Sequence, residues 1–303
     1  MNSNVSQLAL IVSTYSRRML VKTTDGKIHN AKIKGKILKP VCGDVVEIVS
    51  ERNEPEKIIH KIHSRKNELT RYNQSRKKES IAANLSMLAI TAGNPPKPDW
   101  FIVDRYIGAA ELMDIKICII INKEDLNWIN QETKIIINSY KEIGYPVIAC
   151  SAKKKINLNL INLQLKNNVT IFVGQSGVGK STIINNISCN SEQSTKMIST
   201  TTSMGQHTTV NSNMIDLPDG GSVIDSPGVR EFIPSIDSET KVASSFIEIQ
   251  KHGMHCKYND CLHIRENNCE VKSALKGKLI NERRYESYKR LINEVKQSNK
   301  LKY

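Results

Sequence analysis

Residues 174–181, Gly-Gln-Ser-Gly-Val-Gly-Lys-Ser, have the spacing G-x4-G-K-[ST] of a phosphate-binding loop. An apolar strand is predicted over residues 169–173 and a helix over residues 182–187, which is the context that this loop requires. Glycines let backbone N–H groups converge on phosphate oxygens, while Lys180 supplies a cation and the Ser181 hydroxyl can bind Mg²⁺. The alternative, a glycine-rich turn without a ligand, is disfavoured by the flanking strand and helix. The candidate phosphate-binding residues are Gly174, Gln175, Ser176, Gly177, Val178, Gly179, Lys180, Ser181 and Thr182.

Two more motifs follow predicted strands and indicate which base is bound. Asn-Lys-Glu-Asp at 122–125 comes after an apolar strand at 115–121, and Asp125 can accept hydrogen bonds from N1 and the exocyclic amine of guanine. Adenine does not offer both donors in that arrangement. Ser-Ala-Lys at 151–153 follows a strand at 146–150, and its backbone can contact the guanine carbonyl oxygen. N-K-x-D alone is a weak pattern that also fits a plain turn, but three motifs at three strand ends favour a guanine nucleotide. The candidate base-binding residues are Asn122, Lys123, Glu124, Asp125, Ser151, Ala152 and Lys153.

A further acidic motif, Asp-Ser-Pro-Gly at 225–228, also follows a short apolar strand. Asp225 would supply a carboxylate for Mg²⁺, and the N–H of Gly228 would contact the γ-phosphate. Before this motif, Thr208 and Thr209 lie in a Ser/Thr-rich stretch without periodicity, as expected of a loop that nucleotide and metal order together. Either threonine could be the Mg²⁺ ligand, and we favour Thr209.

Three of the seven cysteines lie with a histidine in one short segment near the C-terminus, in the pattern C-x4-C-x-H-x5-C. Three thiolates and an imidazole suit tetrahedral Zn²⁺, and four protein ligands leave no open position for catalysis. The spacing differs from that of a C₂H₂ finger, and His252 and His255 are alternatives to His263. The predicted zinc ligands are Cys256, Cys261, His263 and Cys269. The scattered cysteines, expected to be packing residues, are Cys42, Cys118, Cys150 and Cys189.

The net charge of +14 is unevenly distributed along the chain. Residues 1–78 have a net charge of +10, residues 79–237 of −2 and residues 238–303 of +6. A basic excess at the two flanks indicates that the ends bind a polyanion such as nucleic acid. The alternative is a lysine-rich proteome, which would spread the charge more evenly.

Short β-branched segments and turns dominate the N-terminal region. Strands are predicted at 18–23, 27–33 and 45–49, with Asp25-Gly26 as a hairpin turn. This pattern predicts a small β-barrel of the OB type over residues 1–66. The following residues 67–80 are predicted as a basic linker that lies along a phosphate backbone, although a merely solvated linker fits equally well. Basic side chains surround Tyr72 here. They begin just before the linker with Arg65 and Lys66, and those within it are Arg71, Arg76, Lys77 and Lys78.

From residue 81 onward, apolar strands alternate with helical stretches, which predicts a mostly parallel sheet covered on both faces. Binding loops then lie at the carboxyl ends of its strands. Strands are predicted at residues 85–91, 115–121, 146–150, 169–173 and 223–224. The tail is predicted to be helical over residues 276–296. We therefore predict a multidomain chain with an RNA-binding barrel at 1–66, a linker at 67–80, an α/β nucleotide-binding domain at 81–237 and a mostly helical zinc-binding domain at 238–303.

The motif order is N-K-x-D, S-A-K, phosphate loop, Thr-Thr and D-x-P-G, whereas ordinary GTPases begin with the phosphate loop. With a barrel before these motifs and a Cys/His cluster after them, the chain resembles the circularly permuted small-subunit ribosome-assembly GTPases of the RsgA (YjeQ) family. The resemblance covers essentially the whole chain. It implies an OB-fold, a zinc-containing C-terminal domain and a guanine nucleotide cycle on the 30S particle. Permutation is physically tolerable because the same loops converge in space wherever the chain begins.

One residue departs from the pattern of common GTPases. Val229 stands after D-x-P-G, where many GTPases have a glutamine that orients the attacking water, and an aliphatic side chain cannot do so. The family resemblance implies that His207, just before Thr208 and Thr209, performs this catalytic role. A solvent-exposed loop histidine without a role is the alternative.

The predicted function is GTP hydrolysis coupled to late maturation of the 30S subunit, with GTP, GDP and 16S rRNA as further partners and with Mg²⁺ and one structural Zn²⁺ as cofactors. A GTP-sensing RNA-binding module with negligible turnover is the second hypothesis, and a P-loop ATPase or small-molecule kinase is the third. No apolar run approaches the ~18 residues of a membrane span. We expect no membrane partner and a monomer. The seven cysteines, without a secretory signal, predict the cytoplasm.

Overall fold

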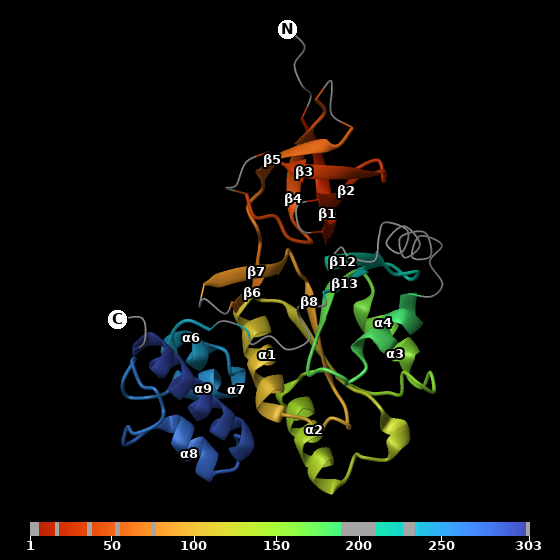
Figure 1. Cartoon of the computed structure of the whole chain (residues 1–303). Coiled ribbons are helices and arrows are strands. Elements are labelled where there is room, and N and C mark those ends of the chain that lie inside the picture. Colours follow the sequence, from red (N-terminus) through yellow and green to blue (C-terminus); the bar gives the residue numbers. More distant parts are fainter. Residues whose placement is uncertain are drawn as a thin grey trace.

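The structure is a computed structural model of the 303-residue chain, and it describes residues 6–15, 18–34, 38–51, 55–73, 77–188, 210–226, 234 and 236–300. It has three parts: a β-barrel of N-terminal strands, an α/β core, and a group of C-terminal helices packed beside the core (Figure 1). This arrangement confirms the predicted fold class.

Five strands form the barrel, and the alternation of their side chains explains why. In β2, Met19, Val21 and Thr23 are buried while the residues between them are not, so one face of the strand lines the interior. β1 pairs with both β2 and β4, β3 pairs with β2 and β5, and β5 pairs with β4, which closes the sheet. The strands are β1 (Gln7–Tyr15), β2 (Arg18–Thr23), β3 (Ile28–Ile33), β4 (Val45–Val49) and β5 (Lys57–Ile62).

Residues 67–80, predicted as a linker, lie mostly in a β-hairpin of β6 (Glu68–Tyr72) and β7 (Lys78–Ala83). Leu69, Ile81 and Ala82 are buried against the α/β core, whereas Lys77 and Lys78 are exposed. A simple linker is therefore the wrong local structure. The sequence does not reveal the strands because only a few apolar residues of the hairpin face inward. The many basic residues between them obscure the alternation of apolar and polar residues that is typical of a strand.

The core sheet has the order β10-β9-β8-β11-β13-β12, in which neighbouring strands are parallel except for β12. Alternate residues of its strands point to opposite faces: Leu88 and Ile90 belong to the cluster beneath α1 and α2, and Met87 and Ala89 to the cluster beneath α3 and α4. The strands are β8 (Met87–Ala92), β9 (Lys116–Ile121), β10 (Val147–Ala149), β11 (Val169–Val173), β12 (Val210–Asp216) and β13 (Ser222–Asp225). The helices are α1 (Trp100–Leu112), α2 (Gln131–Ile143), α3 (Leu158–Leu165), α4 (Lys180–Ser188) and the 3₁₀ turn η1 (Glu124–Leu126).

β12 joins the core to the barrel, because it pairs with β13 on one side and with β1 on the other. The barrel and the core thus form one continuous sheet of eleven strands. The Ser13 hydroxyl donates to the Ser212 carbonyl oxygen at 3.2 Å, and the Lys22 ammonium lies 2.7 Å from the Asp216 carboxylate. The sequence analysis predicts neither β12 nor its pairing with the barrel.

The C-terminal helices are α6 (Glu239–Ser244), α7 (Ile247–Gly253), α8 (Glu270–Lys276) and α9 (Glu282–Lys300). The single helix predicted over residues 276–296 is wrong in its boundaries, since α8 ends at Lys276 and α9 begins six residues later. The side chain of Asn281 accepts from the N–H of Arg284 at 3.4 Å, as a residue before a helix can do, and this explains the later start of α9.

A buried ion network attaches these helices to the core. Arg284 and Asp104 are both almost fully buried, and their side chains meet at 2.9 Å. Arg284 also binds Glu248 on α7, and Arg283 binds Asp104 at 2.6 Å. The Tyr140 hydroxyl on α2 donates to the same aspartate at 2.7 Å. The network therefore holds α1, α2, α7 and α9 together.

Among the helices of the described ranges, none combines the length and the apolar character needed to cross a bilayer.

Candidate functional site

The phosphate-loop motif connects β11 to α4, as predicted. Gly174 has φ +135°, and an added Cβ there would overlap the backbone of Thr91 on the neighbouring β8. Gly179 has φ +97°, and an added Cβ would overlap the side-chain amide of Asn122. Both positions therefore need glycine for two reasons, the left-handed backbone and the close approach of another chain segment.

Lys180, the first residue of α4, is buried, with 8% of its surface exposed. Its ammonium donates to the carbonyl oxygens of Gly174 at 2.7 Å and Gln175 at 2.6 Å. Because of these bonds the lysine side chain turns back over its own loop, and its positive charge lies beside the first two loop residues. Ser181 follows on the first turn of α4.

The side chain of Asn122 joins the base motif to the phosphate loop. Its amide nitrogen donates to the Val178 carbonyl oxygen at 2.8 Å, and its oxygen accepts from the N–H of Ala152 at 2.9 Å. Lys123 has a left-handed backbone, φ 66°, and its ammonium donates to the carbonyl oxygens of Pro95 at 2.5 Å and Gly177 at 2.8 Å. The three motifs, separate in sequence, therefore share direct hydrogen bonds.

Asp125 is held by the serine of the S-A-K motif. The Ser151 hydroxyl donates to the Asp125 carboxylate at 2.5 Å and accepts from the N–H of Lys154 at 3.0 Å. The N–H of Glu124 donates to the Cys150 carbonyl oxygen at 3.0 Å, which ties η1 to the end of β10. The carboxylate is thus fixed in orientation by a neighbouring motif, while Lys153 is exposed at the surface.

Cys150 lies beneath this base loop and contacts the same asparagine, with its sulfur 3.5 Å from the Asn122 side-chain oxygen. Burial raises the pKa of Cys150 to about 12, so it remains a thiol that can donate to that oxygen. Cys118 and Cys42 are also buried. These three cysteines are packing residues, as predicted, whereas Cys189 lies outside the described residues.

Asp225 ends β13, and β13 runs parallel to β11, with Ile224 opposite Ile171. Its carboxyl end therefore lies at the same edge of the sheet as the phosphate loop, as predicted. The other predicted switch residues lie outside the described residues, namely His207, Thr208, Thr209, Gly228 and Val229.

A contact that the sequence analysis missed comes from the segment between β8 and α1. The N–H of Asp99, the residue that caps α1, donates to the side-chain oxygen of Gln175 at 2.9 Å. Pro95 in the same segment accepts from Lys123. The only sequence signal for this segment is the Gly-Asn-Pro-Pro turn after a strand, which does not indicate what the turn touches.

The four predicted zinc ligands converge. The ligand atoms of Cys256, Cys261, His263 and Cys269 all lie within 4.8 Å of one another. The Nδ1 atom of His263 is 3.5 Å from the sulfur of Cys256 and 3.4 Å from that of Cys269. Among the described residues there is one such cluster, and neither His252 nor His255 belongs to it. His263 is therefore the histidine of the set.

The surroundings of the cluster suit a tetrahedral cation. Burial lowers the pKa of His263, which keeps the imidazole neutral, and burial raises the pKa of Cys261 to about 12, which leaves its thiol neutral unless a cation displaces the proton. The Glu266 carboxylate accepts from the N–H groups of Leu262 and Ile264, at 3.1 and 2.8 Å, and so shapes the loop between the ligands. The Tyr285 hydroxyl donates to the His263 carbonyl oxygen at 2.5 Å.

An α/β core with a phosphate loop, a guanine-type N-K-x-D loop and a S-A-K loop at one edge of its sheet defines a GTPase. Its base-binding strands β9 and β10 precede the phosphate-loop strand β11 in the chain, so the GTPase is circularly permuted. The model of the RsgA GTPase family matches residues 62–233, and the chain belongs to this family.

Two sequence relatives and two solved structures extend this result. The chain is 34% identical over 300 residues to the small ribosomal subunit biogenesis GTPase RsgA of Haemophilus influenzae (strain PittGG), covering 97% of this chain and 86% of that protein. It is 32% identical over 302 residues to the protein of the same name from Klebsiella pneumoniae (strain 342), covering 95% of this chain and 84% of that protein. The crystal structure of YloQ, a circularly permuted GTPase, matches with a TM-score of 0.73, 25% identity and 98% coverage of both chains. YjeQ from Thermotoga maritima shares the fold, with a TM-score of 0.74 and 24% identity. The match covers 96% of this chain and 99% of that chain.

Family membership makes the chain a GTP-hydrolysing enzyme that uses a guanine nucleotide with Mg²⁺. The hypothesis of a P-loop ATPase or small-molecule kinase is therefore wrong.

Proposed function

We propose that this GTPase hydrolyses GTP during late maturation of the small ribosomal subunit and that it binds 16S rRNA through its basic flanks. The observation that supports this most directly is the site itself, where one asparagine joins all three nucleotide motifs, in a chain whose relatives are named for small-subunit biogenesis. The alternative of a GTP sensor with negligible turnover is not favoured, because the chain belongs to a family of GTPases. The protein acts as a monomer in the cytoplasm.

In this proposal guanine is recognised by the Asp125 carboxylate, whose orientation is already fixed before the base binds. Asp125 accepts from N1 and the exocyclic amine of the base, and the Ser151 hydroxyl keeps it in the orientation that this pairing needs. The backbone around Ala152 and Lys153 contacts the guanine carbonyl oxygen. Asn122 and Lys123 act indirectly, because their side chains bind the phosphate loop and fix the distance between base and phosphates.

The triphosphate is bound by the loop before α4. The N–H groups of residues 174–182 donate to phosphate oxygens, and Lys180 exchanges its bonds to the loop carbonyls for bonds to the outer phosphates. Ser181, Thr209 and Asp225 would hold Mg²⁺, which would supply positive charge to the phosphates. Gly228 contacts the γ-phosphate, and His207 orients the attacking water.

The Cys₃His cluster holds one structural Zn²⁺. Its four side chains would supply the four ligands that structural Zn²⁺ takes, and the convergence of their ligand atoms within 4.8 Å of one another supports this assignment. Cys256, Cys261, His263 and Cys269 would, by holding the ion, crosslink the loop between α7 and α8 and stabilise the helices that pack on the core.

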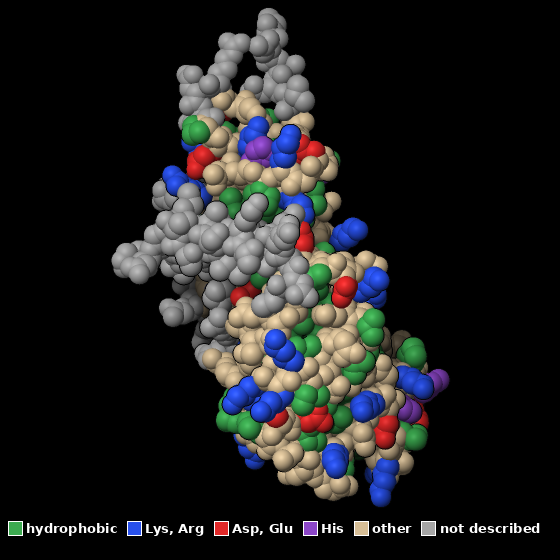
Figure 2. All heavy atoms as spheres, turned by 90° about the vertical axis from the view of Figure 1, so that its right-hand side faces the viewer, with side chains coloured by type: hydrophobic (Ala, Val, Ile, Leu, Met, Phe, Trp, Pro, Cys, Tyr) green, Lys and Arg blue, Asp and Glu red, His purple; other side chains and the backbone are tan. Residues whose placement is uncertain are grey.

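In this proposal the barrel at 1–66 and the helical domain at 238–303 bind RNA and the core at 81–237 binds the nucleotide, while residues 67–80 lie mostly in the hairpin β6–β7. Residues 1–78 and 238–303 hold the basic excess, whereas residues 79–237, which contain the nucleotide motifs, have a net charge of only −2. On the face drawn in Figure 2, Lys and Arg side chains of the described residues are spread over barrel and core among acidic ones. RNA contact through several separate basic groups suits that distribution better than one concentrated patch.

The deciding measurement is steady-state GTP turnover with and without purified small ribosomal subunits. We expect Lys180→Ala and Ser181→Ala to abolish turnover, while Lys141→Ala, the loss of an exposed lysine on α2, leaves it intact. Wild-type turnover that does not change when subunits are added would contradict the proposed coupling of hydrolysis to the small subunit. Normal turnover in both phosphate-loop variants would exclude the assigned site.

A further inference from the structure

The segment that follows β8, residues 93–99, lies along the phosphate loop. A Cβ added at Gly93 would lie 3.3 Å from the carbonyl oxygen of Val178, in the middle of the loop. At the other end of the segment, the N–H of Asp99 donates to the side-chain oxygen of Gln175, the second loop residue, at 2.9 Å. The segment therefore contacts the loop both at its beginning and in its middle.

The middle of the loop is also held from the base motif. The Lys123 ammonium donates to the Gly177 carbonyl oxygen, and the Asn122 side chain donates to the Val178 carbonyl oxygen, each at 2.8 Å. These bonds use carbonyl oxygens of the loop rather than its N–H groups, which are the groups proposed to bind phosphate. Nucleotide binding therefore need not break them.

Gln175, at the beginning of the loop, is held by both its main chain and its side chain. Its carbonyl oxygen accepts from the Lys180 ammonium at 2.6 Å, and its side-chain amide accepts from Asp99 and donates to the Lys97 carbonyl oxygen at 3.4 Å. In the proposed function Lys180 gives up its bonds to the loop carbonyls when it turns to the outer phosphates. The side-chain bonds of Gln175 do not involve Lys180, so they remain when the nucleotide is bound.

Asp99 is a firm attachment point because it begins α1. Its carboxylate accepts from the N–H of Phe101 at 3.0 Å and so caps the helix. Farther along α1, the buried Asp104 meets Arg284 of α9 at 2.9 Å, and the helix packs on the core sheet. The side chain of Gln175 thus joins the loop to a helix that is itself held on two sides.

We infer that Gln175 is a positioning residue for nucleotide binding, whose side chain keeps the beginning of the phosphate loop against α1 after Lys180 has turned to the phosphates. The inference rests on the proposed function, because it assumes that the nucleotide binds at this loop. In this role the Gln175 side chain touches neither the nucleotide nor the metal. Its loss should weaken binding more than it slows the reaction, because the loop holds the phosphates both before and during hydrolysis.

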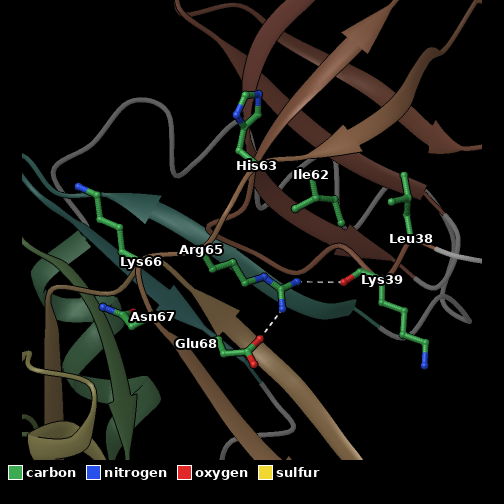
Figure 3. Close-up of a pocket in the computed structure, with 8 residues that line it drawn as sticks. All are labelled: Leu38, Lys39, Ile62, His63, Arg65, Lys66, Asn67 and Glu68. Carbon is green, nitrogen blue, oxygen red and sulfur yellow. Dashed lines mark hydrogen bonds and ion pairs between the residues drawn. The ribbon is translucent and has the colours of Figure 1, made fainter.

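Asn67 offers a matched control, since it is an amide that joins two segments at the opposite end of β8. Figure 3 shows it at an open pocket of about 600 Å³ between barrel and hairpin. Its side chain donates to the carbonyl oxygen of Leu85 and accepts from the N–H of Leu85, both at 2.9 Å. Leu85 precedes β8, whereas the segment 93–99 follows it. Asn67→Leu therefore removes two structural hydrogen bonds away from the nucleotide motifs.

The test uses the full-length protein with Gln175→Met, which keeps the length of the side chain and removes its hydrogen bonds, with Gln175→Ala, and with the control Asn67→Leu. Titration with GTP gives the dissociation constant, steady-state turnover gives kcat and KM, and thermal unfolding without nucleotide reports folding. We expect both Gln175 variants to bind GTP roughly 3- to 10-fold more weakly, which is the scale of one lost hydrogen bond. KM should rise by the same factor and kcat should stay within about twofold of wild type, because uniform binding is lost.

Two further measurements separate positioning from stability. Amide hydrogen exchange at Asp99 should become faster in both Gln175 variants, because the acceptor of this N–H is gone. Asn67→Leu should lower the melting temperature and bind GTP as wild type does.

A purely structural role of Gln175 would give a different result. Wild-type GTP affinity in both Gln175 variants would overturn the inference, as would an equal loss of affinity in Asn67→Leu or weaker binding that merely follows a lower melting temperature. Lys180→Ala separates this failure from that of the proposed function. If Lys180→Ala abolishes turnover and Gln175→Met binds GTP as wild type does, only the inference is wrong; if Lys180→Ala turns over GTP normally, the assignment of the loop itself is wrong.

Discussion

The side-chain amide of Asn122 donates to the carbonyl oxygen of Val178 at 2.8 Å, across fifty-six residues of sequence. The oxygen of the same amide accepts from the N–H of Ala152, in the third motif. Asn122 is 2% exposed, so these bonds have no competition from water. Circular permutation changes which of these loops comes first in the chain. The hydrogen bonds that join them do not depend on chain order, because the loops meet at one edge of the sheet.

Asn122→Ala tests this junction. The substitution leaves the buried Ala152 N–H and the Val178 carbonyl oxygen without their partner, which costs roughly 1–3 kcal/mol for each unsatisfied group. We expect a lower melting temperature and a GTP affinity weaker by at least ~10-fold, because base and phosphate loops lose their fixed spacing. Thermal unfolding with and without GTP measures both. Asn127→Ala, in the exposed turn after η1, is the control. Equal behaviour of the two variants would contradict the bridging role.

Asp125→Asn changes the base that is read. An amide presents a donor where guanine N1 and its amine also donate, so GTP should bind less tightly and xanthosine triphosphate, which offers an acceptor, should bind better. The Ser151 hydroxyl can still donate to the amide oxygen, which keeps the loop in place. Competition between the two nucleotides for wild type and variant gives the ratio directly. Unaltered GTP affinity would mean that Asp125 does not read the base.

The nucleotide motifs were predictable from the sequence because each consists of contiguous residues whose types are dictated by the ligand. Gly174, Lys180 and Asp125 fall where the sequence places them. The hydrogen bonds between motifs were not predictable, since the partners of Asn122 and Lys123 are backbone N–H and carbonyl groups, which nearly every residue has. The choice of His263 over His252 or His255 likewise required the folded loop, because spacing alone allowed all three.

Long-range strand pairing limited the fold prediction. The residues of β1 are apolar enough to suggest a strand, yet its pairing with β12 joins segments about two hundred residues apart, and no local pattern specifies such a partner. The hairpin β6–β7 was hidden for another reason: lysines and arginines outnumber its buried Leu69 and Ile81. The helical tail was foreseen, but the interruption before α9 depends on one asparagine cap.

Metal analysis of protein purified without chelators should give one zinc per chain. Cys261→Ala, or strong chelation, should unfold the segment 250–275 and leave GTP binding intact, because the nucleotide loops lie on the core sheet. Since structural zinc sites supply folding free energy, the loss should appear as protease sensitivity of that segment. His252→Ala is the matched control and should retain zinc. Protein that contains no zinc, or loses it in the control variant, would contradict the ligand set.

Asp104→Asn should destabilise the junction of core and C-terminal helices. The variant leaves Arg284 and Arg283 beside a neutral amide, and breaking a buried pair in this way costs ~3–5 kcal/mol. Glu286→Gln, which breaks an exposed pair with Lys289, should cost no more than ~1 kcal/mol. Denaturant unfolding measures both, and similar small losses would show that the network contributes little.

The pH dependence of that difference has a definite sign. Burial alone would raise the pKa of Asp104, but the charges of Arg284 and Arg283 leave it below its ordinary value. A lowered pKa in the folded state means that the stabilisation is complete above the ordinary aspartate pKa of about 3.9 and is lost as pH falls through the folded value. The gap between wild type and Asp104→Asn should therefore be constant near neutral pH and shrink only in acid.

The last prediction concerns His207, which lies outside the described residues. Val229 cannot orient a water molecule, and His207 directly precedes the two threonines of which one is proposed to meet Mg²⁺. We propose that the His207 imidazole orients the attacking water beside the γ-phosphate when nucleotide and metal are bound. Nucleotide affinity should not depend on it, because no base or phosphate contact is assigned to this side chain.

We therefore expect His207→Ala to keep its GTP affinity and to lose turnover by ~10² or more, the usual scale for a positioned acid–base group. The variant should also accumulate on small ribosomal subunits in the GTP state, since the step that follows hydrolysis is blocked. Single-turnover hydrolysis with saturating subunits separates the chemical step from binding and product release. His255→Ala, a histidine outside the metal cluster, is the control and should hydrolyse GTP as wild type does. Turnover by His207→Ala equal to that of His255→Ala would assign the orientation of the water to another group, either a backbone N–H of this chain or the ribosomal subunit.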